Sequence, residues 1–152
     1  MDRRSDMTDP APETLTELIL RASAQVSSTL GIRLKPLGLQ VDEMRVLHAL
    51  NASGSAAGGL SMTELSDALV IGGPTLTRMA DRLVSENLVY RAPDPHDRRR
   101  VRLHLTDTGE ACAAEAAEIV ADIQQMLTAR FAELDLDDLS SALARTASPL
   151  ND

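Results

Sequence analysis

The sequence predicts a mainly α-helical protein with one small β-hairpin, and three observations lead to that fold class. Apolar side chains recur at spacings of three and four along most of the 152 residues, which is the period of helices packed on one face. The period changes to two only between Leu88 and Leu105, as in a pair of short strands. Hydrophobic residues make up 43% of the chain, enough for the core of one domain with helical additions.

The amino-terminal part is predicted to be a tail followed by a long amphipathic helix. Residues 1–13 contain two prolines and are expected to form a flexible tail. Residues 14–38 are predicted as a helix with its terminal turn, and the helix starts at a capping box made by Thr14 and Glu17. Such a one-sided helix is typical of dimerisation. Its apolar face carries Leu15, Leu18, Ile19, Ala22, Val26 and Leu30.

A second helix is predicted from about Asp42 to Asn51. His48 lies beside its apolar face, and we interpret it as a buried polar group rather than a pocket wall. Residues 52–59 are rich in Gly, Ala and Ser and are predicted to form a loop. The residues expected to face the core are Val46, Leu47 and Leu50.

Two further helices follow, joined by a tight turn at Gly72 and Gly73. The first opens at the capping box of Ser61 and Glu64. The second opens at Pro74, because the missing N–H of proline has no helical partner at that position anyway, and extends to about Asn87. This is the layout of a helix-turn-helix whose second member is the recognition helix. The side chains expected inside are Leu65, Ala68 and Leu69 in the first helix, and Leu76, Met79, Ala80 and Leu83 in the second.

A β-hairpin is predicted directly after the recognition helix. Residues 88–91 and 100–105 form its strands and residues 93–97 its turn. A hairpin in this place is a wing, so residues 39–106 are predicted to be a winged helix-turn-helix domain. The inner side chains are expected to be Val101, Leu103 and Leu105, with Arg102 and His104 facing outward.

Residues 107–152 are predicted to form two helices. The first is about 25 residues long, or about 37 Å, which is longer than a small domain needs. The second begins near Asp135 and stops before Pro149, with apolar residues on one side and acidic residues on the other. We therefore expect these helices to complete a dimer with the first helix. The side chains expected inward in the last helix are Leu136, Leu139 and Leu143.

Basic residues are concentrated in the middle of an acidic chain. The whole chain has a net charge of -8, whereas residues 72–104 carry +3, and every basic residue among them is Arg. Arginine suits phosphate and guanine edges, because its rigid fork of donors matches both. A solvated helix face and a solubilising turn are the simpler alternatives, but three consecutive arginines repel one another and favour DNA contact. The predicted double-stranded DNA interface is Thr75, Thr77, Arg78, Arg82, Arg98, Arg99, Arg100 and Arg102.

The composition excludes several other classes of protein. One Phe and one Tyr, with no Trp, disfavour a single-strand binder that stacks bases on aromatic side chains. One Cys and three dispersed His offer neither a disulfide nor a metal site, and no cofactor is predicted. No nucleophile with a base and no phosphate loop is found, so no enzyme is predicted. No apolar stretch approaches the roughly 18 residues of a membrane helix, and a cytoplasmic protein is expected.

The run from Gly73 to Gly109 resembles the MarR-type winged-helix transcriptional regulators. The resemblance implies a homodimer whose two winged helix-turn-helix units read a pseudo-palindromic operator. It also implies that Asp97 pairs with Arg99 and presents it to the minor groove, and that a small phenolic or other aromatic effector releases a repressor from DNA. The segments that carry the resemblance are residues 74–83 of the recognition helix, 88–91 of the first strand, 94–100 of the tip and 105–109 of the return into the long helix.

Two other functions stay open on the sequence. A winged helix can serve as a protein-interaction module, which the negative net charge would suit, although the arginine tip argues against it. A redox-sensing regulator would act through Cys112. We interpret Cys112 as a packed and inert thiol instead, because it lies in the alanine-rich start of a long helix.

Overall fold

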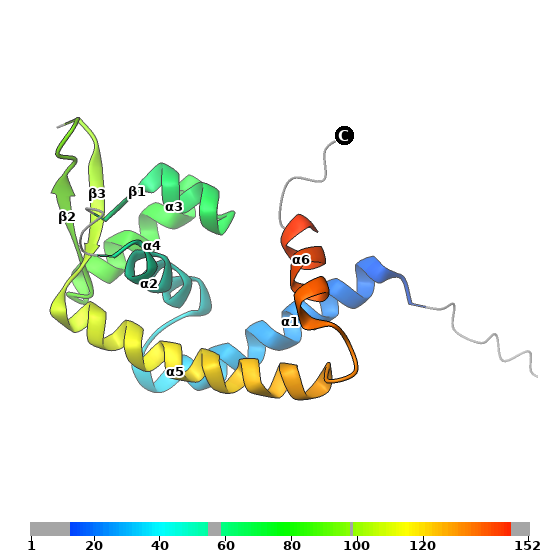
Figure 1. The fold of residues 1–152 in the computed structure, drawn as a ribbon. Helices are drawn as coiled ribbons and strands as arrows, with labels where there is room; N and C mark the ends of the chain where they lie inside the picture. Colours follow the sequence, from blue (N-terminus) through cyan, green and yellow to red (C-terminus); the bar gives the residue numbers. More distant parts are fainter. Residues whose placement is uncertain (1–12, 55–58, 98, 147–152) are drawn as a thin grey trace, which may run out of the picture.

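The computed structural model describes residues 13–54, 59–97 and 99–146, and the fold class predicted above is confirmed (Figure 1). Most of the predicted tail, part of the 52–59 loop, Arg98 and the last six residues lie outside these ranges. The described helices are α1 (Leu15–Leu34), the 3-10 helix η1 (Lys35–Leu37), α2 (Val41–Ser53), α3 (Met62–Leu69), α4 (Gly73–Ser85), α5 (Asp107–Arg130) and α6 (Leu136–Thr146). The strands are β1 (Leu60–Ser61), β2 (Val89–Pro93) and β3 (Val101–Leu105).

Three predicted helix starts lie within one residue of the positions expected from the sequence. The hydroxyl of Thr14 accepts the N–H of Glu17 and the Glu17 side chain accepts the N–H of Thr14, which is the expected capping box. Ser61 and Glu64 repeat this arrangement at the start of α3. Gly72 precedes α4, with Pro74 in its first turn. Each of these signals lies within one helical turn, so tertiary packing did not override it.

The sheet has one strand more than the sequence predicted. Its order is β1-β3-β2, and all pairs are antiparallel. In β1, Leu60 pairs with Leu103 and Ser61 pairs with Arg102. A strand of two residues shows no period of its own, so the sequence around Leu60 and Ser61 predicts only a loop and a helix start.

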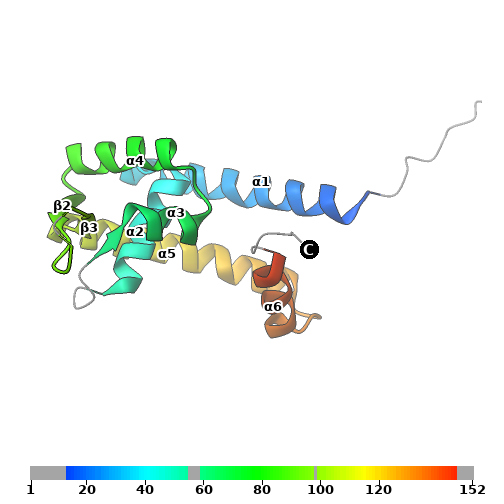
Figure 2. The same ribbon diagram turned by 90° about the horizontal axis from the view of Figure 1, so that it is seen from above.

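The core lies in the head, by which we mean α2, α3, α4 and the sheet. Side chains from every helix of the head meet there, together with the end of α1 and two alanines in the first half of α5. The long helices α1 and α5 leave the head in the same direction, and α6 follows at the far end of α5 (Figure 2). The buried core residues include Leu34, Val46, Leu47, Leu50, Leu65, Leu69, Leu76, Met79, Ala80, Leu83, Val89, Leu103, Ala113 and Ala116.

Four of the side chains predicted to face inward are exposed in the structure. Ala68 is exposed, because Leu65 and Leu69 already face the core and Ala68 lies to one side of them on α3. Val101 is 46% exposed, since it pairs with Pro93 near the wing tip, beyond the core. His48 is exposed because it lies one residue past the buried Leu47 on α2. In α6 no side chain is buried, and Leu143 is exposed.

The terminal helices keep their apolar faces open in the single chain. Leu15, Leu18, Ile19 and Leu20 of α1 are exposed, as are Met126 of α5 and Phe131 and Leu134 after it. One ion pair, between Arg33 and Asp122 at 3.3 Å, joins α1 to α5. No described helix is long and apolar enough to cross a membrane.

Candidate nucleic-acid interface

Helix α4 presents a polar outer face. Leu76, Met79, Ala80 and Leu83 bury its inner side, and this leaves Thr75, Thr77 and Arg78 exposed on the other. The hydroxyl of Thr77 donates to the carbonyl of Gly73 at 2.9 Å, so its methyl group remains for outside contacts. The predicted recognition face is therefore present as one exposed surface.

Arg82 differs from its neighbours because its guanidinium, although half-exposed, is held by contacts with other parts of the protein. It lies 3.2 Å from Glu43 and 3.0 Å from Glu86, and it donates to the Gly38 carbonyl at 2.9 Å. The hydrogen bond to Glu86 and the charge of Glu43 raise the pKa of Arg82 above its ordinary value. Arg82 thus joins α4 to α2 and to the turn after η1, rather than extending from the face of Arg78.

Glu43 was missed by the sequence reading. Its side chain is 2% exposed, and it also accepts the N–H of Gln40 at 2.9 Å at the start of α2. The sequence did contain a signal for this pair. Glu43 is an acidic residue beside the apolar face of one helix, and Arg82 is a basic residue on another helix.

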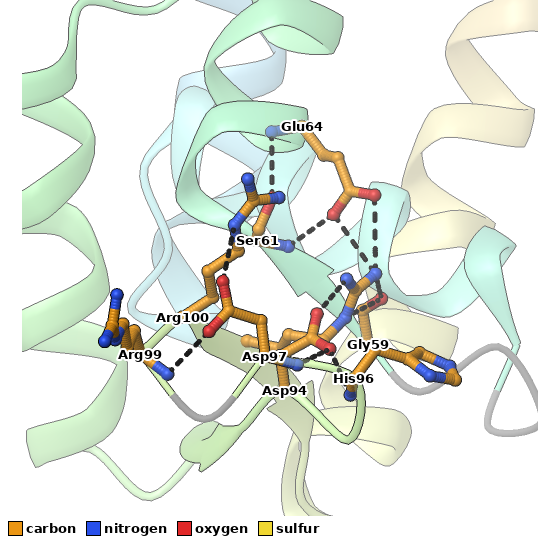
Figure 3. Close-up of polar contacts among 9 residues, drawn as sticks. Gly59, Ser61, Glu64, Asp94, His96, Asp97, Arg99 and Arg100 are labelled. Atoms are coloured by element: carbon orange, nitrogen blue, oxygen red, sulfur yellow. Dashed lines mark hydrogen bonds and ion pairs between the residues drawn. The ribbon is translucent and has the colours of Figure 1, made fainter.

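The wing is the hairpin of β2 and β3 with the turn between them, and it rises at one end of the head (Figure 1). At its tip, the carboxylate of Asp97 accepts the backbone N–H of Arg99 at 3.0 Å and lies 3.5 Å from the guanidinium of Arg100 (Figure 3). The side-chain pair expected between Asp97 and Arg99 is thus a backbone contact, and the ion pair is with Arg100. The Arg99 and Arg100 side chains are exposed, and Arg98 lies outside the described residues.

Arg102 follows Val101 in β3, just below the tip of the wing, and is largely enclosed, with 17% of its side chain exposed. Its guanidinium is 2.8 Å from the buried carboxylate of Asp94 and 3.1 Å from Glu64, and it donates to the Gly59 carbonyl at 2.8 Å (Figure 3). The backbone N–H of His96 and the Arg102 guanidinium hold the pKa of Asp94 below its ordinary value. Arg102 therefore does not project outward as the strand alternation predicted, and Asp94, Glu64 and Gly59 were not anticipated as its partners.

His104 was expected on the outer face of the wing, facing solvent or phosphate. It is instead half-buried and stacks on Tyr90, with ring centroids 5.0 Å apart. Burial, with a smaller contribution from the charge of Arg102, lowers the pKa of His104. The stack belongs to the packing of β2 against β3, where Tyr90 and His104 are paired in register.

Cys112 packs against the edge of the core. It is half-buried, and burial followed by the charges of Glu115 and Glu86 raises the pKa of its thiol. A raised thiol pKa leaves little thiolate, which is the reactive form. Within the described residues, no cluster of three or more His, Cys, Asp or Glu side chains is suited to a metal ion.

The chain resembles known regulators over most of its length. The sequence profile of the MarR family matches residues 37–100, which contain the helix-turn-helix and most of the wing. The multiple antibiotic resistance protein MarR of Escherichia coli K12 is 32% identical over 115 residues, which cover 75% of this chain and 77% of that protein.

Two solved structures show the same fold bound to DNA. A MarR mutant from E. coli complexed with operator DNA has a TM-score of 0.70 at 28% identity, covering 90% of this chain and 94% of that one. The S. aureus MepR–DNA complex has a TM-score of 0.80 at 23% identity, covering 91% and 99% of the two chains, which is a likeness of fold. On the sequence identity, the shared architecture and the outer face of α4 beside the wing, the chain belongs to the MarR family of winged-helix transcriptional regulators and is a DNA-binding regulator rather than an enzyme.

Proposed function

We propose that the protein is a homodimeric, sequence-specific repressor that binds a pseudo-palindromic operator in double-stranded DNA and is released by a small aromatic or phenolic effector. The observation that carries the DNA contact is the pairing of two exposed surfaces, the Thr75, Thr77 and Arg78 face of α4 and the Arg99 and Arg100 tip of the wing. Both belong to the part of the chain with positive net charge. Helix α6 and the far half of α5 extend away from α4 and the wing (Figure 2).

The two surfaces have different roles in the proposed complex. Arg78 and the threonines contact base edges in the major groove, where Arg matches guanine and the Thr methyl matches thymine. Arg99 and Arg100 neutralise phosphates and enter the narrow minor groove, which is sequence-independent to first order. Arg82 is left out of the contact set, because Glu43, Glu86 and Gly38 already occupy its donors. Arg98 is kept as a wing-tip contact on its sequence position alone.

The homodimer is supported by the apolar faces that α1 and the end of α5 leave exposed. Leu15 is 73% exposed and Leu20 is 63% exposed, although both lie on an amphipathic helix that begins with a strong cap. An isolated apolar face of this kind is covered in solution, and a second copy of the same helices is the matching surface. Two heads held by such a dimer would read half-sites about one helical turn apart.

Release by an effector is supported by a small apolar hollow between α1 and α5. It has a volume of about 130 Å³ and is lined mainly by Val26, Ile123, Met126 and Leu127. A planar aromatic ring suits a hollow of that chemistry, and a dimer partner would enclose it further. Because the hollow lies between the helices that carry the heads, occupation would change the spacing of the recognition helices and lower DNA affinity. A regulator of this type works beside the DNA, and we place it in the cytoplasm.

Binding titrations on cognate and scrambled duplexes at two salt concentrations test the proposal. Arg78→Ala loses discrimination between the duplexes, at a cost of ~1–3 kcal/mol for one base pair. Arg99→Ala weakens both duplexes alike and lowers the salt slope by about one. Arg145→Ala, which removes a charge from α6, is the matched control and leaves both unchanged. Equal losses for Arg78→Ala and Arg99→Ala on both duplexes would contradict the division of labour.

The same assay separates the other functions. A protein-interaction module would show no preference for the DNA upstream of its own gene over a scrambled duplex. A redox sensor would lose DNA binding after mild peroxide treatment in the wild type but not in Cys112→Ser, and the half-buried thiol with its raised pKa predicts no such loss. Addition of benzoate and 4-hydroxybenzoate to the bound complex tests the effector class, with release of DNA as the expected result.

A further inference from the structure

Just below its tip, the wing holds a polar network that neither the proposed DNA contact nor the proposed dimer uses. We propose that Arg102 and Asp94 form a positioning pair that ties the wing tip to the start of α3, and that Arg102 affects DNA binding only through the position of Arg99 and Arg100. This inference rests on the wing contact proposed above. Arg102, which the sequence predicts as a DNA contact, is then a residue that positions the DNA contacts Arg99 and Arg100.

The donors of Arg102 are directed into the protein on three sides. Nη1 donates to Oδ2 of Asp94 at 2.8 Å, and Nη2 donates to the carbonyl of Gly59 at 2.8 Å and lies 3.1 Å from Oε2 of Glu64 (Figure 3). The side chain is 17% exposed, compared with 73% for Arg100 at the tip. A guanidinium surrounded by these acceptors would have to break an ion pair with a buried carboxylate to reach a phosphate.

Asp94 connects this arginine to the turn. Its Oδ2 accepts a hydrogen bond from the Arg102 guanidinium. Its Oδ1 accepts hydrogen bonds from the backbone N–H groups of His96 at 2.8 Å and Asp97 at 3.2 Å. The N–H of Asp94 donates to the carbonyl of Arg100 at 2.9 Å, which closes the turn. One carboxylate therefore links β3 to the backbone that carries the wing tip.

Glu64 connects the same arginine to the helix-turn-helix. Its Oε2 accepts the N–H of Ser61 at 2.7 Å in the capping box of α3, and Ser61 is the β1 residue that pairs with Arg102 in the sheet. Gly59 completes this side with a φ of +72° and such a close approach to Leu103 that a Cβ would overlap the Leu103 carbonyl. Position 59, whose carbonyl accepts the hydrogen bond from Arg102, therefore requires glycine.

These contacts form one continuous path from α3 to the wing tip. It runs from the α3 cap through Glu64 to Arg102, from there to Asp94, and from Asp94 to the amides of the turn. Asp97 continues it by accepting the N–H of Arg99. Removing Arg102 leaves the buried carboxylate of Asp94 without its charged partner and frees the turn to move.

The first test uses a substitution for which positioning and simple electrostatics predict opposite signs. Asp94→Asn keeps an oxygen for the turn amides but removes the charge that holds Arg102. Because it also removes a negative charge from a DNA-binding head, electrostatics alone predicts tighter DNA binding. The positioning pair predicts weaker binding, by about tenfold, as for a residue that acts on the site through others.

The control is Asp67→Asn, which removes an exposed acid from α3 of the same head. It is expected to leave DNA affinity unchanged or slightly increased. Circular dichroism melts accompany each variant, and the comparison is made where both remain folded. DNA affinity of Asp94→Asn equal to or above that of the wild type would overturn the proposal.

The second test is a mutant cycle between Arg102 and the arginines of the wing tip. Arg102→Met lowers DNA affinity in the wild-type background and has no further effect when Arg99 and Arg100 are both replaced by Ala, because the contacts it aims are gone. Arg102→Lys keeps a charge for Asp94 without the fork of donors and recovers part of the loss. A second salt-slope decrease of about one on adding Arg102→Met to the double variant would show a direct phosphate contact and overturn the proposal.

A third test measures the order of the wing without DNA. NMR gives the hydrogen-exchange rates of the backbone amides of His96, Asp97 and Arg99. Positioning predicts faster exchange of all three in Arg102→Met, and unchanged exchange would overturn it. If Arg99→Ala with Arg100→Ala leaves DNA affinity unchanged, the proposed wing contact fails. In that case Arg102 cannot affect DNA binding through those two arginines, and this part of the proposal is overturned together with the wing contact. The exchange rates still decide whether Arg102 and Asp94 order the wing.

Discussion

The head and the terminal helices use the same kind of residue in opposite ways. In the head, Leu47 and Leu65 are completely buried within one chain. In α1, Leu15 and Leu20 lie on a helix of equal regularity and are mostly exposed. The core of the head is thus closed within one chain, whereas the terminal helices leave apolar surface exposed that the proposed dimer would cover. In the proposed dimer, the terminal helices would determine where the two heads are held.

The largest effect is expected from placing charge on the open face of α1. Replacing Leu18 and Ile19 with Asp puts two carboxylates into the proposed dimer interface and weakens the dimer by about 1,000-fold, since such anchors cost about 2 kcal/mol each. Analytical ultracentrifugation measures the dimer, and circular dichroism verifies that the head remains folded. Thr16→Asp, on the same helix, is the control. An unchanged dimer would show that α1 is not the interface.

Truncating one leucine in each region sharpens the comparison. Leu47→Ala opens a cavity in the head and costs ~2–5 kcal/mol of unfolding free energy at any protein concentration. Leu15→Ala costs little in the monomer, and its cost grows with protein concentration because dimerisation adds stability by mass action. Denaturant unfolding at two concentrations measures both. A concentration-dependent cost for Leu47→Ala would contradict the view that the head is complete in one chain.

A smaller effect is expected from the ion pairs of Arg82. Glu43→Gln removes the charge of a side chain that is 2% exposed, whereas Glu86→Gln does so for one that is 40% exposed. The melting temperature should fall by about 2–6 °C for Glu43→Gln. Water already screens Glu86, so its loss is expected to have little effect. Equal effects of the two substitutions would mean that burial does not decide the strength of these contacts.

The smallest effect is a pH dependence from His104. Because burial lowers its pKa in the folded state, the unfolded chain takes up the proton first as the pH falls. Stability is therefore fully present above the ordinary value of 6.5 and declines as the pH falls from there through the folded-state pKa. His104→Gln should flatten the pH dependence of the melting temperature between about pH 7 and 5. Identical pH profiles for wild type and His104→Gln would contradict this.

Local signals along the chain predicted most of the elements. Thr14 with Glu17 and Ser61 with Glu64 cap helices where expected, and the recognition helix buries the four predicted side chains. The sequence also placed Thr75, Thr77 and Arg78 together on an exposed face. These predictions hold because caps and helical period act within one or two turns, where the sequence order is also the spatial order.

The sequence by itself determined the helix starts, the recognition face, the arginine tip and the family resemblance. Only the tertiary structure decided which arginines are free to meet DNA, because Arg78 and Arg82 look alike in sequence while Glu43 and Gly38 hold only Arg82. In the same way, strand alternation points Arg102 outward, but a short third strand and the Asp94 carboxylate enclose it. Contacts between residues far apart in the chain depend on how the elements pack, and no local pattern records that geometry.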